Sequence, residues 1–131
     1  MTNIVVRTER GWAGHFICAD RCLFRRNTLL ECGDTRIVVS TVGLLRRLEG
    51  GGFRTTDGTH YFETMAFHAK ESDIRYHDAD VSRQVQFESA RGIDELDADD
   101  RANTMHETVV QEISNRLQGG DLFETTPQEE W

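Results

Sequence analysis

Residues 97–118 carry the clearest pattern in the chain, because apolar side chains recur there at the spacing of one helix face. Those positions are Ala102, Met105, Val109, Ile113 and Leu117. Asp97 stands where an N-cap belongs, and Gly119 with Gly120 closes the segment. The opposite face carries only polar side chains, which are Thr104, Glu107, Gln111 and Gln118. The pattern predicts an amphipathic helix that covers an apolar surface.

Short runs of β-branched and aromatic residues predict strands in the earlier part of the chain. They lie at 3–8, 15–19, 28–31, 36–42, 60–68 and 81–88. The run at 36–42 is apolar on both faces, so we place it in the middle of the sheet. Gly33-Asp34 predicts a hairpin turn before it. The Arg-rich segment 20–27 is expected to lie outside the strands, and 44–48 is compatible with one helical turn.

These elements predict an α+β domain over residues 1–120. It consists of an antiparallel sheet of about five strands, with one long C-terminal amphipathic helix packed on one face. A chain of 131 residues fits one such domain. The segment 121–131 holds four acids and the single proline, Pro127, and it predicts a disordered acidic tail.

The formal net charge of -8 is divided unevenly between the two parts of the chain. Residues 1–56 hold nine arginines and five acids, or +4, which leaves -12 for residues 57–131. This balance opposes direct binding of nucleic acid and favours a basic partner. The start of the chain has no apolar run of signal-peptide length and no segment is apolar enough to span a membrane, so we expect a cytoplasmic protein.

The sequence contains one candidate zinc site and one candidate calcium site. His15, Cys18, Cys22 and Cys32 could make a tetrahedral zinc site, but a strand at 15–19 would point His15 and Cys18 to opposite faces. Small buried cysteines are the preferred interpretation. The acidic run at 94–100 fails the calcium-loop pattern, because Ala102 stands where that loop needs glycine. We therefore expect no metal and no cofactor.

The sequence contains none of the catalytic signatures that would indicate an enzyme. The sequence has no G-x-S-x-G motif, and the triple glycine at 50–52 lacks the Lys-Ser or Lys-Thr of a phosphate loop. The sparsely placed histidines His60, His68, His77 and His106 are expected to be structural or exposed. We predict that the protein is not an enzyme.

Arg21, Arg25 and Arg26 form the best candidate for nucleic-acid contact, since aromatic residues lie among and before them in the sequence. Three arginines are a small footprint for such a site. The other interpretation is that these arginines pair with acids of the same chain, which would account for the opposite charges of its two parts.

Two segments carry a resemblance to known proteins. They are RGWAGHFICADRCLFRRN at 10–27 and YFETMAF at 61–67. With them, the chain resembles small proteins carried by phages and mobile elements, a group that includes anti-CRISPR proteins. The resemblance implies an inhibitor that acts in a bacterial host cell by occupying the surface of a host protein.

The functional hypothesis joins this resemblance to the acidic charge. Carboxylates that could replace a series of phosphates would block the basic nucleic-acid channel of a host defence complex such as a CRISPR effector. We expect this partner-binding face to comprise Asp73, Asp78, Asp80, Asp94, Glu95, Asp97, Asp99, Asp100 and Glu107. Such an inhibitor, a nucleic-acid mimic, would contact neither nucleic acid nor membrane directly. The alternatives are a small RNA- or DNA-binding module using the three arginines, and a zinc-stabilised small domain.

Overall fold

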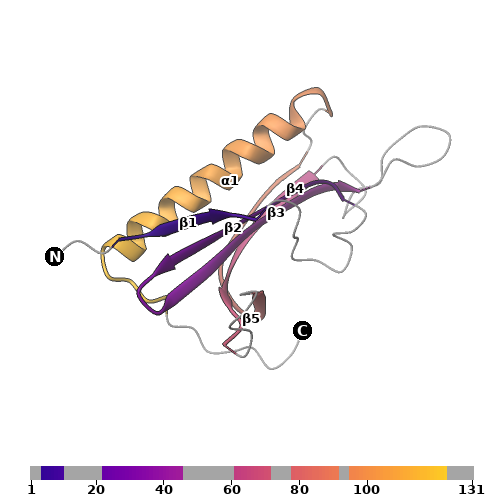
Figure 1. Ribbon diagram of the computed structural model, residues 1–131. Helices are drawn as coiled ribbons and strands as arrows, with labels where there is room; N and C mark the ends of the chain where they lie inside the picture. The colour runs from indigo at the N-terminus through magenta and orange to yellow at the C-terminus, as the bar shows by residue number, and fades with distance from the viewer. Residues whose placement is uncertain (1–3, 11–21, 46–60, 72–77, 92–94, 124–131) are drawn as a thin grey trace.

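The computed structural model describes residues 4–10, 22–45, 61–71, 78–91 and 95–123. These ranges hold five strands and one helix (Figure 1). They are β1 (Val6–Glu9), β2 (Cys22–Cys32), β3 (Thr35–Leu45), β4 (Tyr61–Ala69), β5 (Ala79–Arg91) and α1 (Glu95–Gln118). The arrangement is α+β, which confirms the predicted fold class.

The strands form one antiparallel sheet in the order in which they occur in the chain, β1-β2-β3-β4-β5. β3 is therefore the central strand, as its β-branched run predicted. Val38 and Val39 point to opposite faces of β3, and both are fully buried. Burial of both faces explains why Ile37, Val38 and Val39 form a continuous apolar run instead of alternating with polar residues.

Helix α1 packs along one face of the sheet (Figure 1). Four of the five predicted stripe residues are buried, and Met105 is partly buried. The main core joins helix and sheet through Leu30, Ile37, Val39, Ala66, Val109, Val110, Ile113, Leu117 and Phe123. The amphipathic pattern therefore identified both the helix and the surface that it buries.

The C-terminal end of α1 is closed by a glycine in the left-handed region. Gly120 has φ 91°, its N–H donates to the carbonyl of Leu117 at 3.0 Å, and the N–H of Asp121 donates to Arg116 at 2.9 Å. These two bonds form a Schellman motif. The motif returns the chain to the sheet, so that Phe123 is buried in the core although it falls in the expected tail. Residues 124–131 lie outside the described ranges.

Some predicted boundaries were wrong. β2 begins at Cys22, so the Arg-rich segment continues into the strand, because its backbone pairs with β3 along the whole length and the charge of Arg26 is neutralised by neighbouring acids. Leu44 and Leu45 belong to β3 rather than to a helical turn. α1 starts at Glu95, so Asp97 lies inside the first turn and is not the N-cap. The expected strand at 15–19 lies outside the described residues.

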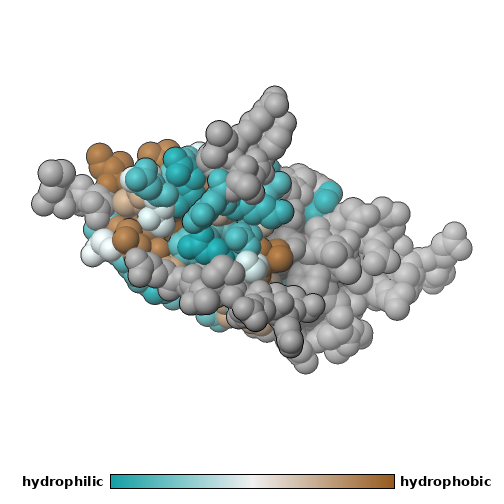
Figure 2. All heavy atoms as spheres, turned by 90° about the horizontal axis from the view of Figure 1, so that it is seen from below, coloured by the Kyte–Doolittle hydropathy of each residue, from teal (hydrophilic) through white to brown (hydrophobic). Residues whose placement is uncertain are grey.

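The sheet face that α1 leaves uncovered is also buried near its centre. Leu29, Val38, Ser40, Val42 and Phe67 on this face are less than 5% exposed. In the view from below, hydrophilic residues gather in the middle of the coloured surface and hydrophobic ones lie at separate points around them (Figure 2). Over the ranges given above, no helix is both long enough and apolar enough to cross a membrane.

Candidate functional site

Four charged side chains meet where β1 and β2 approach the helix, and we refer to them as the ion cluster. They are Arg7, Glu9, Arg26 and Glu107. The Glu107 carboxylate accepts hydrogen bonds from Arg7 Nη1 and Nη2 at 2.8 and 2.6 Å, and another from Arg26 Nη2. Glu9 accepts two bonds of 3.0 Å from Arg26. The cluster thus ties β1 and β2 to α1, with two cations balancing two anions.

A buried chain of hydrogen bonds, which we call the His106 chain, runs from this cluster into the core. Thr28 Oγ1 lies 3.0 Å from a carboxylate oxygen of Glu9 and 2.7 Å from His106 Nε2. Beyond the ring, His106 Nδ1 lies 2.7 Å from Thr41 Oγ1, which lies 2.6 Å from Thr64 Oγ1. The three threonines and the histidine have no exposed surface. Three neighbouring strands therefore converge on one imidazole of the helix.

The direction of each bond in the His106 chain follows from its end at Glu9. An ionised carboxylate only accepts, so Thr28 donates to Glu9 and in turn accepts from His106 Nε2–H. Nδ1 of the neutral ring is then the acceptor, so Thr41 donates to it and Thr64 donates to Thr41. This tautomer is assigned from the network. It satisfies the ring without a buried charge.

Electrostatics agree with a neutral imidazole between charged neighbours. Burial, helped by the nearby guanidinium of Arg26, lowers the pKa of His106 to about 4. Hydrogen bonds from Arg7, and then from Arg26, lower the pKa of Glu107 to about 2 against the opposing effect of burial. For Glu9, burial acts to raise the pKa, but bonds from Arg26 and Thr28 outweigh it and the pKa is lowered. Both carboxylates are therefore ionised at neutral pH.

The chemistry open to His106 is limited by its position. Its hydrogen bonds resemble those of a catalytic base, but a substrate would reach the ring only after α1 had separated from the sheet, because the ring has no exposed surface. A fully satisfied polar chain of this kind fixes how two elements dock. The spacing offered a signal for it, since His106 lies four residues after Ala102 and three before Val109, on the apolar stripe.

The nine predicted partner-binding carboxylates fall in separate parts of the structure. Asp78 and Asp80 lie at the start of β5, whereas Asp100 lies in the helix that follows the end of this strand. A strand of 13 residues extends about 40 Å, so the two groups lie toward different ends of the sheet. The helix also holds Glu95, Asp97 and Asp99 in its first turns, while Asp73 and Asp94 lie outside the described residues.

The described carboxylates also differ in what they already bind. Asp78 and Asp100 are exposed. Asp80 accepts hydrogen bonds from the backbone N and the hydroxyl of Ser82 at 3.1 and 2.6 Å. Glu107 is held by two guanidinium groups of the ion cluster. Asp100 is thus the predicted helix carboxylate whose side chain is both described and open to solvent.

The arginines of the alternative nucleic-acid site are not gathered on one surface. Arg25 and Arg26 are consecutive residues of β2, so their side chains point to opposite faces of the sheet. Arg26 binds Glu9 and Glu107 on the helix side. Arg21 lies outside the described residues. The Arg26 contacts agree with the expectation that these arginines pair with acids of the same chain.

The cysteines of the zinc alternative are only partly described. Cys18 lies outside the described ranges, and Cys22 begins β2. Cys32 is a free thiol whose Sγ lies 3.7 Å from the carbonyl oxygen of Leu117. Among the residues that the structure describes, no three His, Cys, Asp or Glu side chains are grouped as metal ligands.

Comparison with known proteins adds no relative: no family model, no curated protein and no solved structure matches this chain. Its function is therefore argued from its own surface and charges.

Proposed function

We propose that this protein is an inhibitor that binds a host nucleic-acid-handling defence complex, such as a CRISPR effector, through the acidic outer face of α1. The observation that carries the proposal is the charge of this helix. Residues 95–118 hold six acids and two arginines, a formal charge of -4, which becomes -3 without Glu107 because the ion cluster balances that carboxylate. A helix of this charge, docked by its apolar stripe, presents its carboxylates to a basic channel.

Two exposed carboxylates mark the described part of this outer face. Asp100 and Glu112 are exposed and form no ion pair with another described residue. They lie twelve residues apart, about 18 Å along the helix axis. Glu95, Asp97 and Asp99 add acids to the first turns of the same helix. The proposed face is narrower than the one expected from the sequence, since Glu107 is neutralised within the chain.

Direct binding of nucleic acid is not part of the proposal. The net charge of -8 repels a polyanion, and Arg26 and Arg7 already bind carboxylates. An arginine held between two glutamates would have to give up these bonds before it met a phosphate. We therefore expect neither duplex DNA nor single-stranded RNA to bind at physiological salt.

The test compares two double variants of equal charge. Asp100→Lys with Glu112→Lys reverses the outer face of α1, and Asp78→Lys with Glu88→Lys reverses two exposed acids beside and on β5. Each substitution adds two charges, so both proteins go from -8 to -4. Purified parent and variants are added to a panel of CRISPR effectors, and the binding of each effector to its target DNA is measured.

The parent should prevent target binding by at least one effector. The α1 variant should lose about tenfold or more in inhibitory potency, because like charges would then meet at the interface. The β5 variant should stay within about threefold of the parent, since it changes the net charge equally without touching the face. Equal potency of the α1 variant and the parent would disprove the proposal.

A further inference from the structure

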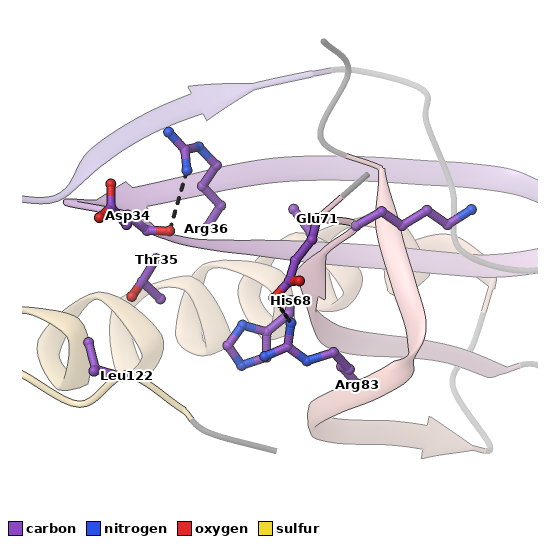
Figure 3. A pocket seen from close by; sticks show the side chains of 9 residues that line it. Asp34, Thr35, Arg36, His68, Glu71, Arg83 and Leu122 are labelled. Carbon is purple, nitrogen blue, oxygen red and sulfur yellow. Dashed lines mark hydrogen bonds and ion pairs between the residues drawn. The ribbon is translucent and has the colours of Figure 1, made fainter. Parts of the chain in front are cut away.

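A cavity of about 220 Å³ lies at the end of the molecule where α1 ends, between the β2–β3 turn, the end of β4 and β5. Its lining is mostly polar and includes Thr35, His68, Lys70, Glu71 and Arg83, with Leu122 at one side (Figure 3). None of these residues belongs to the ion cluster or to the acidic face of α1. The volume is below that of pockets for drug-sized ligands, so it suits a small ligand.

Arg83 is the cation placed deepest in this cavity. Its side chain is 18% exposed, and its Nη1 donates to Glu71 Oε1 at 3.2 Å. The Glu71 side chain is 86% exposed, so solvent screens its attraction to Arg83 and the ion pair is weak. A guanidinium has five N–H donors. The others form no hydrogen bond with the described residues and are available to an anion.

His68 lies beside Arg83 and contributes an acceptor (Figure 3). Its Nε2 bonds the carbonyl oxygen of Phe123, and a carbonyl only accepts, so Nε2 carries the proton. Burial and then the charge of Arg83 act to lower the pKa of His68, which keeps the ring neutral at pH 7. Nδ1 is then a bare acceptor with no partner among the described residues.

The cavity is close to neutral although the protein is strongly negative. Arg36, Lys70 and Arg83 line it together with Asp34 and Glu71, and Glu31 balances the charge of Arg36 at 3.1 Å, whereas the whole chain carries -8. The Arg36 side chain is turned away from His68 toward the backbone of Asp34, which accepts from it at 3.3 Å (Figure 3). Arg83 and His68 are therefore the groups that define what the cavity selects.

We propose that this cavity binds the hydrogen phosphate ion, with Arg83 donating to its charged oxygens and His68 Nδ1 accepting from its P–O–H group. The pair of groups demands an anion that still carries a proton. Inorganic phosphate has such a proton at neutral pH, whereas sulfate and carboxylates do not. Thr35 and Lys70 supply further donors at the cavity wall.

The experiment uses the full-length protein and two probes, inorganic phosphate and sulfate at matched ionic strength. The ring signals of His68 and the amide signals of the protein are followed by NMR during each titration. Phosphate should shift the signals of cavity residues saturably, and sulfate should bind at least about tenfold more weakly, because it has no proton to donate to Nδ1 of His68. Equal affinities for the two ions would overturn the proposal.

Three variants test the role of the guanidinium. Arg83→Gln should weaken the affinity for phosphate about tenfold or more, because a charge-assisted hydrogen bond is lost. Arg101→Gln, on the exposed side of α1, should change this affinity less than twofold. Glu71→Gln should raise the affinity for phosphate, since it removes the carboxylate that competes for Arg83 without disturbing the core. Unchanged affinity in both Arg83→Gln and Glu71→Gln would overturn the proposal.

Discussion

Thr28 of β2 and His106 of α1 are 78 residues apart in the chain, yet Thr28 Oγ1 lies 2.7 Å from His106 Nε2 inside the core. Both side chains are fully buried. The bond is one step in a chain that starts at the charged Glu9 and ends at Thr64. A single change along it leaves a buried donor or acceptor without a partner, which costs more than the bond itself contributes.

Replacement of Thr28 by Val tests this chain, because Val keeps the shape of Thr and removes its hydroxyl. His106 Nε2–H and Glu9 each lose a partner. We expect Thr28→Val to lower the free energy of unfolding by roughly 1–3 kcal/mol. Urea unfolding followed by circular dichroism measures the change.

Thr8→Val is the matched control for this prediction. Thr8 lies in β1 and is exposed, so the same substitution should change stability by no more than about 0.5 kcal/mol. If Thr28→Val were as stable as Thr8→Val, the hydrogen bonds of Thr28 would contribute nothing to docking of the helix.

The second prediction concerns the stability of the protein at acidic pH. The pKa of His106 is lowered from 6.5 to about 4, so the unfolded chain takes up this proton before the folded protein does. The stabilisation by neutral His106 is complete above pH 6.5 and is lost as the pH falls toward 4, by roughly 3 kcal/mol in total. The lowered pKa values of His68, Glu9 and Glu107 act in the same direction.

The free energy of unfolding should therefore be flat between pH 7 and 8 as far as these groups are concerned, and should decrease steadily from pH 6.5 to 4. Urea titrations at intervals across this range measure the slope. NMR of the His106 ring in the folded protein provides a direct check. A ring that titrates near pH 6.5 without loss of the fold would contradict the prediction.

The third prediction concerns the apolar stripe. Val109 is 1% exposed within the main core, so Val109→Asp would place an unpaired charge among buried side chains. We expect a loss of roughly 4 kcal/mol or more, enough to unfold most of the protein at room temperature.

Thr108→Asp introduces the same group one residue earlier, on the exposed side of α1. It should leave the fold intact and the melting temperature within a few degrees of the parent. Thermal melts of both variants by circular dichroism test the pair. Similar melts for Val109→Asp and Thr108→Asp would mean that the stripe is not the docking surface.

The contacts within the ion cluster and the His106 chain are not predicted by any local pattern in the sequence. The helix stripe identified Val109 and Ile113, but nothing local indicates that Glu107, on the polar side, meets Arg7 at a distance of 100 residues in the chain. Polar residues share the same pattern whether they face water or an ion of the same protein. Only the register of β1 and β2 against α1 distinguishes the two cases.

The amino-acid sequence by itself determined the helix, its glycine end, the central position of β3 and the fold class, because these follow from local periodicity and from β-branched residues buried on two faces. The tertiary structure decided which polar groups meet. It brought Thr28, Thr41 and Thr64 under His106 and moved Asp78 away from Asp100 along β5. Such relations depend on strand register and helix docking, which no short stretch of sequence encodes.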